Sequence, residues 1–154
     1  MKFQGEIQVA APREAVFDKI NDPVFFASCI EGVRDMTEID PDHYTATLET
    51  RIAYIKFKFA VTVEVVERDR PSRVVARAEG TPMGIVGRLS STSIATLTDE
   101  GSGTRVAYEI DASLTGKLGS IGQPVMRSKA KEMERQFAKA IAAAFVTSAS
   151  GATA

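Results

Sequence analysis

The chain has 154 residues, of which 44% are apolar and 25% are charged, and its formal net charge is -1. This length supports one domain with a real core, and the composition is typical of a soluble globular protein. A nucleic-acid surface is normally basic, so we expect no nucleic-acid partner. The single cysteine, Cys29, allows no internal disulfide, and the cytoplasm is the simplest compartment for such a chain.

The N-terminal segment predicts one strand followed by two short helices. Residues 3–9 alternate between an apolar side that includes Ile7 and Val9 and a polar side, which is typical of a half-buried strand. Pro12 then favours a helix start, because its missing N–H would be unpaired in the first turn anyway. Asp22, followed by Pro23, predicts a second short helix with Asp22 as its cap.

Six further strands are expected, at residues 33–39, 44–49, 53–67, 74–79, 87–98 and 106–114. The strongest alternation lies in residues 53–67, and residues 80–84 are expected to form an irregular loop. Turn signals separate the strands at residues 40–42, 69–72 and 99–103. The inner face expected for the strand at 87–98 consists of Leu89, Ser91, Ser93, Ala95 and Leu97.

The long helical pattern closes the chain. Its apolar residues recur at helical spacing, whereas Arg127, Lys131, Glu134, Arg135 and Lys139 are assigned to the solvent side. Proline would break a helix interior, so the regular helix is expected to begin near Ser120 or Ile121, with Pro124 in its first turn. The apolar stripe consists of Leu118, Ile121, Val125, Met126, Met133, Phe137, Ile141 and Phe145.

These elements predict an α+β architecture in a single domain. A seven-stranded antiparallel sheet with one wet face must cover its other face, and the long C-terminal helix is the only element able to do so. The sheet is therefore expected to curve around that helix, with the two short helices inserted after the first strand. The domain is expected to span residues 1–146, followed by a disordered tail at 147–154, which is small and polar.

This order of elements resembles the START-like (SRPBCC) helix-grip superfamily, and within it the CoxG family of carbon monoxide dehydrogenase subunits. The resemblance runs from residue 1 to about residue 146. It is carried by Met1–Glu6, Ala11–Phe17, Asn21-Asp22-Pro23, Cys29–Gly32, Gly103–Glu109 and Gly116–Leu118.

The resemblance implies a helix-grip fold and a non-catalytic accessory protein. The implied partner is a molybdenum hydroxylase such as carbon monoxide dehydrogenase, whose membrane association the protein would assist. The resemblance also implies a bound quinone- or lipid-like molecule in place of a conventional cofactor. The expected location is accordingly the cytoplasm, including the inner face of the membrane.

Small and flexible residues predict a ligand cavity between sheet and helix. Ser91 and Ser93 would face Gly122 and Met126 across that space, and methionine adapts to varied apolar ligands. The alternative is that small residues let the helix approach closely. Residues 80–87 could likewise form a gate or an ordinary hairpin. The candidate ligand-binding residues are Phe57, Phe59, Met83, Ile85, Leu89, Ser91, Ser93, Tyr108, Leu118, Ile121, Gly122, Val125, Met126, Lys129 and Met133.

Catalytic and metal-binding chemistry is sparse in this sequence. His43 is the only histidine, so neither a catalytic triad nor a histidine-rich metal site can be built, and a turn-bonding role is expected for it. Cys29 is expected to be a buried small hydrophobe, since no activating base is evident. Lys129 either extends to solvent or meets a polar ligand group. We therefore expect no catalytic and no metal-binding residues.

Two alternatives to a ligand-binding accessory protein remain open, because fold does not settle function. A cyclase or aromatase of the polyketide type would need positioned proton donors and acceptors, for which Glu79, Arg88 and Tyr108 are the candidates. Alternation directs the first two outward. A protein-docking adaptor without any ligand would need only surface patches.

Overall fold

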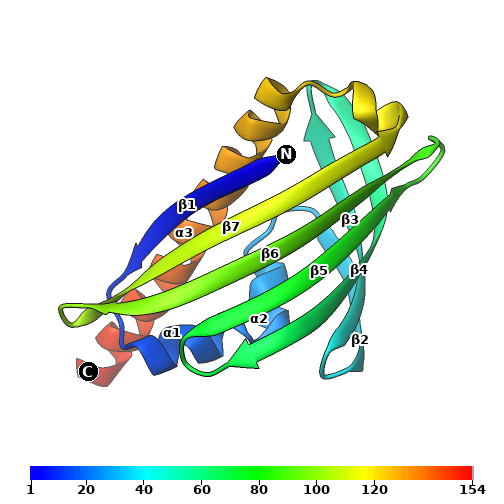
Figure 1. Ribbon diagram of the computed structural model, residues 1–154. Coiled ribbons are helices and arrows are strands. Elements are labelled where there is room, and N and C mark those ends of the chain that lie inside the picture. The colour runs from blue at the N-terminus through cyan, green and yellow to red at the C-terminus, as the bar shows by residue number, and fades with distance from the viewer. Residues whose placement is uncertain (154) are drawn as a thin grey trace.

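The computed structural model describes residues 1–153, with side chains through Phe145, and shows one antiparallel sheet with a long helix across it. The strand order is β1-β7-β6-β5-β4-β3-β2 (Figure 1). This arrangement confirms the predicted α+β helix-grip architecture. The elements are β1 (Lys2–Val9), α1 (Arg13–Ile20), α2 (Pro23–Ser28), β2 (Val33–Asp40), β3 (His43–Ile52), β4 (Ile55–Asp69), β5 (Arg73–Pro82), β6 (Gly87–Glu100), β7 (Gly103–Gly116), η1 (Lys117–Ser120) and α3 (Gln123–Thr153).

The sheet curves, and α3 crosses it on one side (Figure 1). Strands β2 to β7 follow each other as hairpins, and β1 pairs beside β7 through partners such as Phe3 and Ile110. The backbone of α3 comes closest to β1 and β3, which lie on opposite sides of the central strands. The helix therefore rests on the two flanks of the sheet, and side chains occupy the distance to its centre.

The core consists of two separate apolar clusters, one near each end of α3. The first holds Ile141, with Phe137 and Phe145 packed against it, and the second holds Leu118, with Val125 and Met126 packed against it. These positions confirm the predicted apolar stripe of the helix. The buried members of the first cluster are Ile7, Val9, Ala11, Val16, Phe17, Leu97, Val106 and Ile141, and those of the second are Ile52, Phe57, Phe59 and Leu118.

The helix starts follow the predicted chemistry. The Asp22 side chain caps α2 by accepting hydrogen bonds from the backbone N–H groups of Val24, at 3.1 Å, and Phe25, at 3.4 Å. Helix α3 begins at Gln123, so Pro124 lies in its first turn. The helix continues to Thr153, past its predicted end. The side chains of residues 146–154 lie outside the described part, and the disorder expected for 147–154 stays a prediction.

Two strand boundaries differ from the predicted ones. Ile52 pairs with Ile55, so Ala53 and Tyr54 form a two-residue turn where a strand was expected to begin. The favoured residues for such a turn are Asn and Gly, so the sequence carries no signal for it. The expected loop at 80–84 is also wrong in part, because β5 continues to Pro82. Gly80 allows this continuation because an added Cβ would lie only 3.4 Å from the ring of Phe59.

The Ala53–Tyr54 turn is conformationally strained. The φ angles are +52° for Ala53 and +70° for Tyr54, a region that costs an L-residue roughly 1–2 kcal/mol. Replacing the pair by Asn-Gly is expected to raise the free energy of unfolding by about 1–2 kcal/mol in urea titrations. Ser102→Gly, in a turn where that residue has no positive φ, is the control and should bring no gain. Equal gains in both variants would contradict the assignment of strain.

Candidate functional site

The centre of the inner sheet face lies between the two apolar clusters and is built from small side chains. Ser91 and Ser93 on β6 pair in register with Ala78 and Ala76 on β5. All four are only half-buried, although they lie on the face that α3 crosses. A packed sheet–helix interface would bury such residues completely. The middle of the interface is therefore the least covered part of the inner face.

A polar pair joins the sheet to the helix beside this region. The Tyr108 hydroxyl on β7 donates a hydrogen bond to Glu134 Oε2 on α3, and both side chains are half-buried. Burial, and then the hydrogen bond to the Glu134 carboxylate, raise the pKa of Tyr108 well above its ordinary value. The phenol therefore keeps its proton at neutral pH. The predicted inward position of Tyr108 is confirmed.

The prediction that Glu134 faces solvent is wrong. Glu134 lies between Met133 and Phe137 at the border of the apolar stripe, where helical angle alone does not decide the side. Its charge favoured the solvent side, and only the contact with Tyr108 reverses that assignment. Sequence reasoning thus missed one half of the polar pair.

Gly5 makes room for this polar pair. It lies on β1 directly opposite Tyr108, and an added Cβ would lie 2.6 Å from the Tyr108 hydroxyl and 2.9 Å from Glu134 Oε2. A glycine inside a strand commonly marks a close approach of another group. That signal was present in the sequence, but nothing in it indicated which group approaches.

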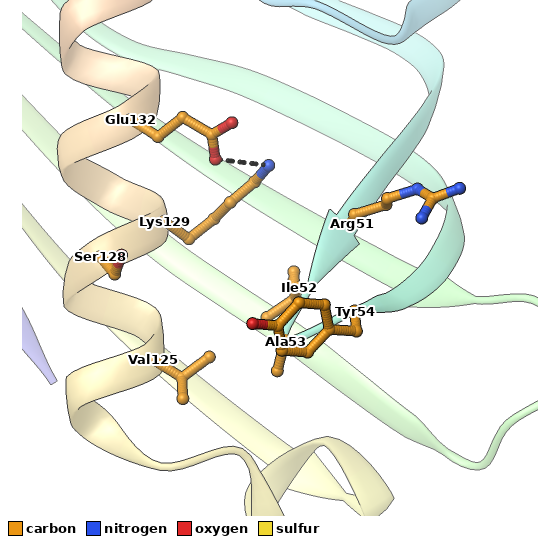
Figure 2. Close-up of a pocket in the computed structure, with 8 residues that line it drawn as sticks. All are labelled: Arg51, Ile52, Ala53, Tyr54, Val125, Ser128, Lys129 and Glu132. Carbon is orange, nitrogen blue, oxygen red and sulfur yellow. Dashed lines mark hydrogen bonds and ion pairs between the residues drawn. The ribbon is translucent and has the colours of Figure 1, made fainter.

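A pocket of about 340 Å³ lies near the N-terminal end of α3. Figure 2 shows the β3–β4 hairpin on one side of it and α3 on the other. Lys129, whose side chain is 13% exposed, lines this pocket and places its Nζ 3.1 Å from Glu132 Oε2. Lys129 is therefore held beside the pocket by an ion pair. The lining residues are Arg51, Ile52, Ala53, Tyr54, Val125, Ser128, Lys129 and Glu132.

The structure brings together about half of the predicted ligand-binding residues. Eight meet in or against the second apolar cluster, whereas Tyr108 packs against the first. Ser91, Ser93 and Met133 are half-buried, and Gly122 and Met83 are exposed. Whether these residues bind a ligand stays a prediction. The eight are Phe57, Phe59, Ile85, Leu89, Leu118, Ile121, Val125 and Met126.

The candidates for other chemistry do not assemble. Glu79 and Arg88 are exposed on neighbouring strands, with their charged atoms 3.9 Å apart, and neither contacts Tyr108. Cys29 is buried, as predicted, and burial raises the pKa of its thiol. Within the described residues, no group of three or more His, Cys, Asp or Glu side chains could hold a metal ion.

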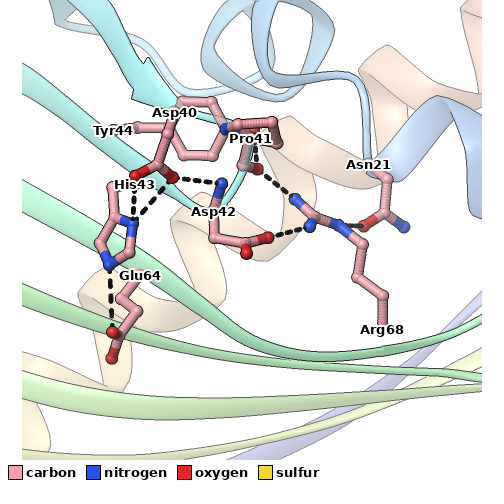
Figure 3. A network of polar contacts seen from close by, with 8 residues as sticks. All are labelled: Asn21, Asp40, Pro41, Asp42, His43, Tyr44, Glu64 and Arg68. Carbon is pink, nitrogen blue, oxygen red and sulfur yellow. Dashed lines mark hydrogen bonds and ion pairs between the residues drawn. The ribbon is translucent and has the colours of Figure 1, made fainter.

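His43 belongs to a polar network at the β2–β3 turn, as its predicted turn-bonding role requires (Figure 3). Its Nδ1 lies 2.8 Å from Asp40 Oδ1, and its Nε2 lies 3.1 Å from Glu64 Oε2 on β4. Arg68 extends the network by donating to the Asp42 carboxylate and to the Asn21 side chain. These contacts fasten the turn to the neighbouring strand and to the segment after α1.

The family description for the carbon monoxide dehydrogenase subunits called CoxG matches residues 5–146, which is most of the domain. The chain belongs to the CoxG family. This match confirms the resemblance seen in the sequence. A search of curated proteins found no match. Within the described CoxG chain, no helix is long and apolar enough to cross a membrane.

Solved structures show the same fold. A conserved protein from Geobacillus kaustophilus is 27% identical, with a TM-score of 0.87, and the match covers 96% of this chain and 97% of that one. A protein from Mycobacterium smegmatis is 18% identical, with a TM-score of 0.68 and coverage of 96% and 92%. One from Thermus thermophilus is 16% identical, with a TM-score of 0.64 and coverage of 94% and 99%.

The His43 network predicts a pH-dependent stability. The hydrogen bond to Asp40, and then that to Glu64, raise the pKa of His43 above its ordinary value of 6.5. Stabilisation by the charged imidazole is therefore complete below that value and is lost as pH rises through the folded pKa. The Tm difference between wild type and His43→Gln should shrink between about pH 6 and pH 8. A constant difference across this range would contradict the assignment.

The close approach at Gly5 predicts a large effect of one methyl group. Gly5→Ala should lower the free energy of unfolding by about 1–3 kcal/mol, because its Cβ would collide with the Tyr108 hydroxyl and Glu134. Gly122→Ala is the control, since its Cβ would make only an ordinary contact of 3.7 Å with Pro124. Urea denaturation measures both. Similar losses in the two variants would mean that the space at Gly5 is not tight.

Proposed function

We propose that this protein is a binding and recruitment module that holds a lipophilic small molecule between the sheet and α3. Its proposed ligand is quinone- or lipid-like, and its proposed partner is a molybdenum hydroxylase such as carbon monoxide dehydrogenase, at the inner face of the membrane. Membership in the CoxG family supports the accessory role. The ligand is supported by the inner face of the sheet.

The observation that carries the proposal is the half-buried centre of this inner face. Ser91, Ser93 and Ala78 are short, and Met133 on α3 is half-buried as well. The helix is anchored by one apolar cluster toward each end, so its middle does not need to pack tightly on the sheet. Small-molecule sites are commonly concave, mostly apolar and supplied with a few polar groups. A flexible methionine suits ligands of irregular shape.

The Tyr108–Glu134 pair supplies the polar group that such a ligand needs. A quinone carbonyl carries no charge and accepts hydrogen bonds, so it requires a neutral donor. The raised pKa of Tyr108 keeps the phenol protonated, and its hydroxyl is a donor on the sheet side of α3. In the proposed complex, Tyr108 orients the ligand by redirecting or sharing this hydrogen bond.

Native mass spectrometry of the freshly purified protein, followed by organic extraction, tests the proposal. Wild type is expected to carry an isoprenoid quinone or a lipid at near-stoichiometric amount. Ser91→Phe should lose it, because the larger ring fills the space above β6. Thr92→Phe is the matched control, since Thr92 is exposed on the opposite face of the same strand.

Two results would overturn the ligand hypothesis. One is a wild-type protein that carries nothing and binds neither ubiquinone nor menaquinone when these are added in detergent micelles. The other is an equal loss of bound molecule in Ser91→Phe and Thr92→Phe, which would report a general folding defect instead of a filled site. Circular dichroism of both variants separates that defect from a specific loss.

A further inference from the structure

Exposed apolar side chains gather at one end of the sheet. This end, which we call the hairpin end, holds the β3–β4 turn, the β5–β6 turn at residues 83–86, η1 and the start of α3 (Figure 1). Tyr54 is 98% exposed, Val86 79%, Ile55 54% and Met83 51%. Large apolar groups at adjacent loop tips commonly mark an interaction surface.

The hairpin end is a connected structure, so these side chains share one surface. Lys117 N–H donates to the Val86 carbonyl at 2.9 Å, which ties η1 to the β5–β6 turn. Ile52 and Ile85 meet in the second apolar cluster, directly below the two turns. The pocket of about 340 Å³ opens beside Tyr54 at the same end.

The backbone at Tyr54 indicates that this side chain is placed for a purpose other than stability. Ala53 and Tyr54 both adopt positive φ, which Asn and Gly would adopt at lower cost. An aromatic residue that is almost fully exposed regains none of this cost by burial. Strain of this kind is often retained where a side chain serves function.

The hairpin end is also strongly basic. Residues 49–58, 79–88 and 117–132 hold eight of the 19 Lys and Arg residues, but only three of the 20 Asp and Glu residues. The three acids are neutralised by ion pairs, namely Glu49 with Lys56, Glu79 with Arg88 and Glu132 with Lys129. Within the described residues, five cations have no ion-pair partner: Arg51, Lys58, Lys117, Arg127 and Lys131.

We propose that the hairpin end docks on an anionic lipid bilayer. Tyr54, Ile55, Met83 and Val86 enter the interfacial layer, and the surrounding Lys and Arg side chains meet the lipid headgroups. Charge complementarity selects a bilayer, because the apolar tips project from a cationic surround in a chain whose net charge is -1. This inference rests on the proposed function, for which it names the membrane-facing surface and a route for a lipophilic ligand beside Tyr54.

Vesicle flotation tests the docking surface. Wild type should float with phosphatidylcholine vesicles that contain roughly one third phosphatidylglycerol, and should bind pure phosphatidylcholine at least tenfold more weakly. High salt should weaken the binding. Lys58→Glu with Arg127→Glu should weaken it about tenfold or more. The combined variant Tyr54→Ser, Met83→Ser and Val86→Ser should do the same.

Ile39→Ser is the matched control, because Ile39 is 65% exposed but lies near the β2–β3 turn at the opposite end of the sheet. It should float like wild type. Equal binding of wild type to both vesicle types, or an equal loss in Ile39→Ser, would overturn the proposal. Capture of a molybdenum hydroxylase by this surface without any vesicle binding would also overturn it, in favour of protein docking.

The same variants separate this inference from the ligand hypothesis. The hairpin-end variants should still take up quinone from detergent micelles, whereas Ser91→Phe should still float with anionic vesicles. A wild type that floats but binds no quinone would leave docking intact and overturn the ligand. Loss of both properties in the hairpin-end variants would overturn a docking surface that is separate from the ligand site.

Discussion

The fold depends on how α3 is held across the curved sheet. The helix is anchored through Ile141 at one end and through Val125 and Met126 at the other, in two apolar clusters that do not merge. Each cluster also joins distant segments, the first by packing α1 against β6 and β7 and the second by packing η1 against the β3–β4 hairpin. Because the anchors lie apart, the middle of the interface is free of the packing requirement that governs a single core.

That freedom explains why small and polar groups are tolerated in the middle. Ser91 and Ser93 would leave costly voids in a tightly packed core, and an unpaired Glu134 would be costly there as well. The Tyr108 hydroxyl satisfies Glu134, and Gly5 supplies the room for both side chains. The interface thus combines an apolar lining with one hydrogen-bonded pair, as binding a neutral lipophilic molecule requires.

The two ends of the sheet differ in chemistry. At the β2–β3 turn, charged groups such as His43, Asp40 and Arg68 satisfy one another in a local network. At the hairpin end, cations outnumber anions, and Tyr54 and Val86 are left in solvent. Networks of the first kind stabilise a turn, whereas the second arrangement leaves both charge and apolar area available to a partner. The molecule is therefore polarised along the strands.

Local pattern by itself determined the secondary structure and the family. Alternation and helical spacing report which residues share a face, so the strands, the Asp22 cap, the stripe of α3 and the CoxG resemblance could all be predicted. The tertiary structure alone decided the side of Glu134, the role of Gly5 and the turn at Tyr54. Each of these depends on a group far away in the chain or on a backbone angle that its residue type does not favour, and neither leaves a periodic signal in the sequence.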